Sequence, residues 1–255
     1  MREFEGRVVL ITGGNKGIGK AIALEFARRG AIVSFGYNSN PEMAQDTLKE
    51  INNLSQGIAM QADLELPDSC LALVNHTVSE YKKIDILINN AALQTHYSML
   101  ESNLKEFKKI ININLRGYYL MSKYSHEYLK ESDQGRIIYM SSVHGKRPFT
   151  FDGAYAVSKG AIQMLVREAA LEFAKDGITA NAIAPAGVRI EGKTGNPRPI
   201  AIVRSAEVKQ HTGYPIEGRM GVTSDVIGAV CFLASKEAGF ITGTTLRIDG
   251  GGMLM

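Results

Sequence analysis

Short apolar runs rich in β-branched residues alternate along the chain with longer amphipathic stretches. Runs such as VVLI and ILI are apolar throughout, which is typical of parallel strands with helices on both faces of the sheet. The predicted strands are Arg7 to Thr12, Ile32 to Tyr37, Ile58 to Ala62, Ile84 to Asn89, Gly135 to Ser141, Ile178 to Ala184 and Thr245 to Ile248. The predicted helices are Gly17 to Arg29, Pro41 to Leu54, Pro67 to Lys83, Leu104 to Lys130, Ala154 to Lys175 and Ser224 to Ala234.

This alternation predicts βαβ units and therefore a parallel sheet. We expect an α/β fold of the Rossmann type, a doubly wound, seven-stranded parallel sheet formed by residues 1–255 as a single domain. Residues 188–214 interrupt the alternation with the glycines and prolines of GKTGNPRP. Two interpretations of this segment remain, a lid over the substrate or a passive surface insertion.

Charge and composition narrow the classes of partner. The chain has 29 Lys and Arg against 26 Asp and Glu, and its net charge of +3 gives no concentrated basic surface for nucleic acid. No apolar run is long enough to cross a bilayer, and the N-terminus lacks an apolar signal region, so we expect no membrane partner. Cys70 and Cys231 lie far apart in apolar stretches, which favours reduced core residues over a disulfide or metal site and predicts a cytoplasmic protein.

A glycine-rich turn, TGGNKGIG at residues 12–19, joins the first predicted strand to the first predicted helix. Glycines let the backbone turn tightly and approach a pyrophosphate, and the amides and dipole at a helix N-terminus favour negative charge. The turn therefore predicts a dinucleotide site. Its expected cofactor-binding residues are Gly13, Asn15, Lys16, Gly17, Ile18 and Gly19.

The spacing Gly-x-x-x-Gly-x-Gly resembles the short-chain dehydrogenase/reductase family, and three further motifs support the resemblance. Tyr155 and Lys159 match the family's Tyr-x-x-x-Lys, and Ser142 matches its serine at the end of the fifth strand. Asn114, in NINL, matches its relay asparagine. The resemblance implies that Ser142 binds the substrate oxygen, Tyr155 exchanges the proton, Lys159 binds the nicotinamide ribose, and Asn114 completes a proton relay to solvent.

The pair Tyr155 and Lys159 also makes chemical sense from its spacing. Residues four apart on a helix lie on one face, one above the other. A phenol with an ordinary pKa near 10 is a poor base at neutral pH, but a nearby ammonium and an oxidised nicotinamide favour the phenolate. Tyr155 is the predicted general acid and base.

The resemblance extends to the adenine end of the cofactor. The sequence Asn89-Asn90-Ala91-Ala92 is similar to the family's Asn-Asn-Ala-Gly, which implies that Asn90 and Ala91 lie beside the adenine ribose. Asp63, followed by Leu64, stands where relatives place an acid beside the adenine ring. It equally fits a helix cap.

The end of the second strand predicts the cofactor type. NAD-preferring relatives have an acid there for the ribose hydroxyls, whereas this chain has Tyr37. Asn38 and Ser39 can hydrogen-bond a phosphate, and Lys16 matches a basic residue of many NADP-preferring members. NADP(H) is therefore favoured, with NAD(H) also allowed.

The segment after the sixth strand departs from the family pattern. Relatives have Pro-Gly followed by a threonine, whereas this chain reads APAGVRI, in which Ile190 replaces the threonine. Pro185 and the backbone of Val188 are still expected beside the nicotinamide carboxamide.

These motifs together predict an NADP(H)-dependent oxidoreductase that interconverts a ketone, lactone or keto sugar with an alcohol. The segment Ser141-Ser142-Val143-His144 is similar to glucose 1-dehydrogenases, while the whole chain is similar to 3-oxoacyl-(acyl-carrier-protein) reductases, so a sugar and an acyl thioester both remain candidates. The alternative is an NADP(H)-binding sensor or scaffold without turnover. Relatives are usually homotetramers, and the apolar C-terminus fits packing on another subunit.

Overall fold

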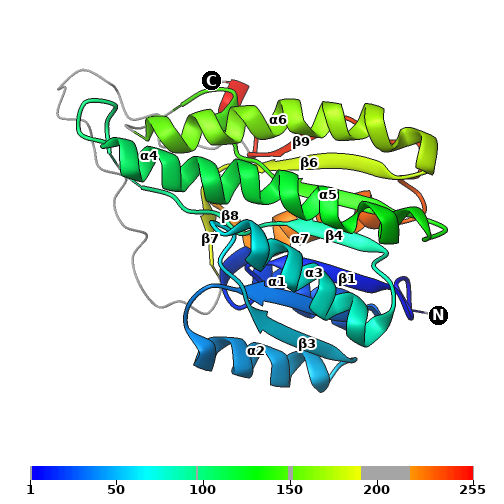
Figure 1. Ribbon diagram of the computed structural model, residues 1–255. Helices are drawn as coiled ribbons and strands as arrows, with labels where there is room; N and C mark the ends of the chain where they lie inside the picture. Colours follow the sequence, from blue (N-terminus) through cyan, green and yellow to red (C-terminus); the bar gives the residue numbers. More distant parts are fainter. Residues whose placement is uncertain (1, 96, 149–151, 191–218, 255) are drawn as a thin grey trace.

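The computed structural model describes residues 2–95, 97–148, 152–190 and 219–254. Within these residues a seven-stranded parallel sheet has the order β3-β2-β1-β4-β5-β6-β9, as Figure 1 shows. Its strands are β1 (Val8–Thr12), β2 (Ile32–Tyr37), β3 (Gly57–Gln61), β4 (Ile86–Asn89), β5 (Arg136–Met140), β6 (Thr179–Pro185) and β9 (Thr245–Ile248). The order reverses between β1 and β4, so the sheet is doubly wound, as predicted.

Helices cover both faces of the sheet (Figure 1). The helices are α1 (Gly17–Arg28), α2 (Pro41–Asn52), α3 (Pro67–Tyr81), α4 (Leu104–Ile111), α5 (Gly117–Lys130), α6 (Gly153–Phe173) and α7 (Thr223–Ala234). Most predicted boundaries differ from the observed ones by one or two residues. The predicted helix from Leu104 to Lys130 is not uniform, because a π-helix at Asn112–Arg116 separates α4 from α5.

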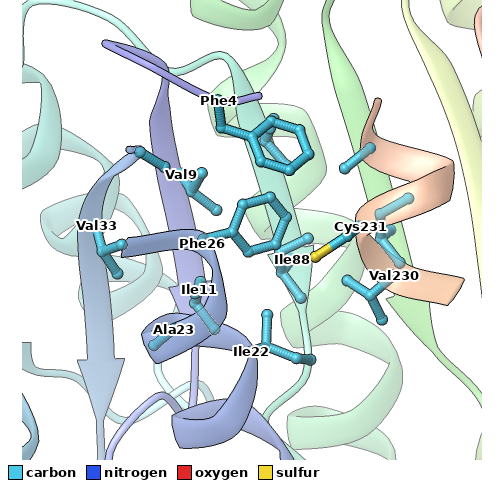
Figure 2. Packing of buried hydrophobic residues seen from close by; sticks show 14 of the residues in the cluster. Phe4, Val9, Ile11, Ile22, Ala23, Phe26, Val33, Ile88, Val230 and Cys231 are labelled. Atoms are coloured by element: carbon cyan, nitrogen blue, oxygen red, sulfur yellow. The ribbon is translucent and has the colours of Figure 1, made fainter. Parts of the chain in front are cut away.

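Alternation of side chains along each strand divides the core into two layers. Val9 and Ile11 of β1 pack with α1, α2 and α7, whereas Leu10 between them packs with α3, α5 and α6. Figure 2 shows part of the first layer, in which Phe26 of α1 stacks against Phe4 with ring centroids 4.8 Å apart. Burial on both faces explains why the strands are continuously apolar.

A second pair of strands was not predicted. β7 (Val188–Arg189) pairs in parallel with β8 (Gly221–Val222) just beyond the end of β6. Each strand has only two residues, too few for a periodic pattern in the sequence. The predicted lid at 188–214 lies outside the described residues except for 188–190.

Candidate active site

The predicted site residues converge at the carboxyl edge of the parallel sheet. The glycine turn follows β1, Tyr37 ends β2, Asn90 follows β4, Ser142 follows β5 and Pro185 ends β6. In doubly wound sheets this edge, at the point where the strand order reverses, forms the ligand crevice. Strands far apart in the sequence therefore bring these residues to one end of the fold.

The glycine turn has the backbone that an anion site requires. Gly13 and Gly17 have φ of +70° and +59°, in the left-handed region. Lys16 is the N-cap of α1 and makes no side-chain capping bond, so the first amides of α1, including that of Ile18, face the turn without a cap. A Cβ on Gly19 would lie 2.1 Å from the Gly13 carbonyl oxygen, so only glycine fits there.

Thr12 and Asn90 join the glycine turn to the end of β4. The backbone amides of Asn90 and Ala91 donate to Thr12 Oγ1 at 2.9 and 3.0 Å. Asn90 Nδ2 also donates to the carbonyls of Thr12 and Gly13, at 2.9 and 3.2 Å. The side chain of Asn90 thus fixes the turn, a role that its sequence position did not reveal.

The loop after β2 is held from both sides. Asn15 Nδ2 donates to the carbonyl of Ser39 and Gln61 Nε2 donates to the carbonyl of Asn38, both at 2.9 Å. Asn38 and Ser39 are exposed, as is Lys16, which follows Asn15 in the glycine turn, and Tyr37 is half-buried. The exposed side chains of Ser39, Asn38 and Lys16 can all donate hydrogen bonds, and the last residue of β2, Tyr37, is not a carboxylate.

Asp63 shapes the turn before α3 and does not cap the helix itself. Its Oδ1 accepts a hydrogen bond from the amide of Glu65 at 2.9 Å, whereas the N-cap position of α3 is Leu66. The helix-cap interpretation of Asp63 is therefore wrong. Leu64 is buried and packs where Gly117 begins α5, its Cβ 3.1 Å from the position of a Cβ at Gly117.

The two residues predicted beside the nicotinamide, Pro185 and Val188, differ in setting. Pro185 is the buried last residue of β6, and the amide of Ala186 donates to the carbonyl of Ile248 at 3.0 Å. Val188 is half-buried and belongs to the short strand β7. β6 and β9 thus hold the start of this segment at the sheet edge.

Ser142 and Tyr155 meet at the centre of the site. Ser142 ends the extended segment after β5, and its hydroxyl lies close enough to the phenol of Tyr155 to act on the pKa of that phenol. Ser142 Oγ also accepts from the amide of His144 at 3.2 Å. The His144 ring packs edge-on to Tyr155, with centroids 5.8 Å apart.

Lys159 lies one helical turn after Tyr155 and is fully buried. Its Nζ donates to the carbonyl of Met140 at 2.6 Å and lies 5.5 Å from the centre of the Tyr155 ring. The neighbouring Ser141 Oγ donates to the carbonyl of Lys159 at 3.0 Å, which fixes this turn of α6 to β5. An ammonium has three donors, so two remain for a ligand in the crevice.

Asn114 reaches the same helix through Ser158. Asn114 Nδ2 donates to Ser158 Oγ at 3.1 Å, and Ser158 Oγ donates to the carbonyl of Tyr155 at 2.7 Å. The carboxamide is fully buried and also forms two hydrogen bonds with the backbone of Leu93. The four predicted residues Asn114, Ser142, Tyr155 and Lys159 therefore lie together around the start of α6.

Burial sets the protonation of this group. It raises the pKa of Tyr155 to about 12, with the nearby Ser142 hydroxyl lowering that pKa and Asp152 raising it. Burial also lowers the pKa of Lys159 to about 7. Without an oxidised nicotinamide, Tyr155 is therefore a neutral phenol at pH 7, whereas the sequence argument, with that charge included, favoured the phenolate.

Within the described ranges, no group of three or more His, Cys, Asp or Glu side chains lies close enough together to hold a metal ion. None of the described helices is long and apolar enough to span a membrane.

Comparisons with known proteins agree with this arrangement. Residues 13–252 match the family model described as enoyl-(acyl carrier protein) reductase. Hydroxynaphthalene reductase arp2 of Aspergillus fumigatus is 33% identical over 94% of this chain and 90% of its own. Glucose 1-dehydrogenase 2 of Bacillus subtilis is 30% identical over 98% of this chain and 96% of its own.

A solved structure gives the same picture of the fold. The blue fluorescent protein from a metagenomic library, in complex with NADPH, has a TM-score of 0.85 and 27% identity over 98% of both chains. The doubly wound sheet, the Asn, Ser, Tyr and Lys residues around the start of α6, and these likenesses define a dinucleotide-linked oxidoreductase. The chain belongs to the short-chain dehydrogenase/reductase family.

Proposed function

We propose that the protein is an NADP(H)-dependent oxidoreductase that interconverts a ketone and an alcohol. The observation that carries this proposal is that Ser142, Tyr155 and Lys159 meet: the Ser142 hydroxyl lies beside the Tyr155 phenol, and Lys159 Nζ is 5.5 Å from the centre of the Tyr155 ring. Ser142 polarises the substrate oxygen, and Tyr155 donates or accepts its proton. Lys159 binds the nicotinamide ribose, and Asn114 holds the relay to solvent.

The turn after β1 fits a dinucleotide by the chemistry of its donors. The uncapped amides of α1 and the close backbone approach at Gly13 and Gly19 suit a pyrophosphate. Asn90, Ala91, Asp63 and Leu64 line the adenine side, and Pro185 and Val188 the nicotinamide side. When bound, the nicotinamide supplies or accepts the hydride, and the chain supplies orientation and the proton.

The protonation state of Tyr155 before the reaction favours carbonyl reduction over alcohol oxidation. A phenol with its pKa raised to about 12 carries its proton at pH 7 and can act as the acid. The Lys159 ammonium then stabilises the phenolate left after transfer, because opposite charges favour each other most strongly in a buried site.

The loop after β2 supports a preference for NADP(H) over NAD(H). Exposed Lys16, Asn38 and Ser39 can all donate to a 2′-phosphate, and Tyr37 carries no charge that would repel it. The relative bound to NADPH is consistent with this preference. Lys16→Ala should raise the Kd for NADPH about tenfold and leave that for NADH within about twofold, which isothermal titration measures.

The substrate class rests on the names of relatives. They include a glucose dehydrogenase and a hydroxynaphthalene reductase, and the description of the family model names an enoyl-(acyl carrier protein) reductase. A panel of keto sugars, aromatic ketones, 3-oxoacyl thioesters and 2-enoyl thioesters, read by NADPH and NADH oxidation, separates these classes. Glucose oxidation tests the reverse direction.

The competing proposal is a sensor that binds NADP(H) without turnover. A binding site needs no proton relay, so the group of residues around Tyr155 favours the enzyme. Tight NADPH binding with no turnover over the whole panel would favour the sensor instead.

The proposal includes a homotetramer, which exposed apolar residues support. Val157, Met164 and Leu171 lie seven residues apart on α6 and are 56, 60 and 78% exposed. A hollow of about 340 Å³ between α4 and the start of α6 adjoins Val157. The edge strand β9, with half-exposed Leu246, offers a second surface, as a tetramer with D2 symmetry requires.

A cytoplasmic location also belongs to the proposal. Cys70 and Cys231 are both buried and unpaired, each on a different face of the sheet. Free buried cysteines are typical of a reducing compartment.

A further inference from the structure

The ammonium of Lys159 lies between two aromatic rings. Its Nζ is 5.4 Å from the centre of the Tyr118 ring and 5.5 Å from the centre of the Tyr155 ring. Tyr118 comes from α5, which covers the same face of the sheet as α6, and Tyr155 comes from the same helix as the lysine. Both distances fall within the range of about 6 Å over which a ring face attracts a cation.

We propose that Tyr118 is a positioning residue, whose ring holds the Lys159 side chain as an ammonium facing Tyr155. The inference rests on the proposed function, since it concerns the state of the lysine in that proton relay. Motif reasoning did not single out Tyr118, because it lies in none of the family motifs. Only the fold brings it to the lysine.

The lysine has few other interactions that favour its charge. Among the described residues no carboxylate forms an ion pair with Lys159, and the one described hydrogen bond of its Nζ goes to the Met140 carbonyl. Burial alone acts to lower its pKa. In such a desolvated setting a ring face is worth more to a cation than at the surface.

The ring of Tyr118, and not its hydroxyl, carries this role. The hydroxyl is buried and has no hydrogen-bond partner within the described part of the chain. Burial first, and then the neighbouring Tyr155, raises the pKa of Tyr118 well above its usual value, so the phenol stays neutral. Phenylalanine would keep the ring face that the lysine needs.

Two titratable groups of the described residues face Lys159, Tyr118 from α5 and Tyr155 from α6. From β5, the Met140 carbonyl accepts its hydrogen bond and carries no charge. Asp152 acts on Tyr155, raising its pKa. For carbonyl reduction the reactive form of the Tyr155 and Lys159 pair carries both protons, so loss of the first proton sets the alkaline limb of the pH profile.

The test compares Tyr118→Leu and Tyr118→Phe with the wild type, using the pH dependence of kcat/KM for NADPH-driven carbonyl reduction. Without the ring the lysine loses its proton more easily, so Tyr118→Leu should move the alkaline limb down by about half to one pH unit. Tyr118→Phe should keep the wild-type limb. If Tyr118→Leu does not fold, Tyr118→Met removes the same ring with a more adaptable side chain.

Tyr139→Leu is the matched control. Tyr139 is a fully buried tyrosine on β5, its ring centroid 6.2 Å from that of Tyr118, and its hydroxyl bonds Ser122 Oγ at 2.7 Å. Its loss should lower the melting temperature without moving the limb. An unmoved limb in Tyr118→Leu and Tyr118→Met, or an equal shift in Tyr118→Phe or Tyr139→Leu, would overturn the inference.

The proposed function itself is tested separately by Tyr155→Phe. If that variant turns over like the wild type, the proposed proton relay fails. If it is inactive while the Tyr118 variants keep the wild-type limb, only the role of Tyr118 fails.

Discussion

The side-chain carboxamide of Asn114 forms hydrogen bonds with both the amide and the carbonyl of Leu93. Asn114 Oδ1 accepts from the amide of Leu93 at 2.8 Å, and Asn114 Nδ2 donates to its carbonyl at 2.9 Å. The pair ties the π-helix at Asn112–Arg116 to the segment after β4. The site thus depends on a contact that also holds two elements of the fold together.

Replacing Asn114 should therefore lower stability as well as activity. Asn114→Ala leaves the buried polar groups of Leu93 without these partners, and we expect the free energy of unfolding to fall by about 1–3 kcal/mol. Urea denaturation measures the change. Asn112→Ala, in the same π-helix, controls for the helix itself, and an equal loss in both variants would contradict the role of the Leu93 contact.

Lys159 should make folding stability depend on pH. Its pKa is lowered in the folded state to about 7, from an ordinary value of 10.5, so between these values the unfolded chain binds the extra proton. The contribution of this group to stability therefore rises with pH across that window. Lys159→Met, which carries no buried charge, should be more stable than the wild type by about 1 kcal/mol or more at pH 6.

That advantage should shrink as the pH rises towards 10.5. Denaturation curves of both proteins at a series of pH values give the difference directly. A difference that stays constant from pH 6 to 10 would mean that Lys159 is protonated alike in the folded and unfolded chains.

The glycine turn makes a prediction about packing. A Cβ on Gly19 would lie 2.1 Å from the Gly13 carbonyl oxygen and 2.5 Å from Asn90 Nδ2. Gly19→Ala should thus destabilise the protein by about 1–3 kcal/mol and weaken NADPH binding at least tenfold. Gly228→Ala on α7, with no atom within 4 Å of its Cβ, should instead be neutral or stabilising. Equal behaviour of the two variants in thermal denaturation would argue against this close approach.

The apolar stripe on α6 predicts the oligomeric state. Met164→Glu places a charge in the middle of the stripe formed with Val157 and Leu171, and it should convert a tetramer to smaller species. Light scattering after size-exclusion chromatography measures the mass. Lys175→Glu, beyond the end of α6, alters the charge without touching the stripe, and a similar dissociation by this variant would count against the stripe as an interface.

Much of the fold could be predicted because its signals are local. The limits of β2 and β9 agree with the structure to the residue, since continuous apolar runs between turns mark buried strands. The π-helix around Asn114 could not be predicted from periodicity, because one widened turn barely disturbs a helical pattern. The short strands β7 and β8 pair residues 33 positions apart, and nothing in either dipeptide indicates a partner.

In the site, too, some residues could be predicted from local sequence and others could not. Motif spacing predicted Ser142, Tyr155 and Lys159 as site residues, and the fold brings them together. It missed the groups that hold them, such as Thr12 Oγ1 and the Met140 carbonyl, because backbone and hydroxyl partners are set by tertiary contacts. The protonation states also depend on burial, which no motif records.

The most direct test of the central claim is carbonyl reduction by Tyr155→Phe with NADPH, measured beside the wild type on the best substrate of the panel. The account predicts that kcat falls by about a hundredfold to ten-thousandfold, because phenylalanine has no proton to donate. NADPH binding, followed by fluorescence, should stay within about threefold, since the hydroxyl contributes at most one hydrogen bond to the cofactor. A variant that binds NADPH and keeps wild-type turnover would show that Tyr155 is not the proton donor.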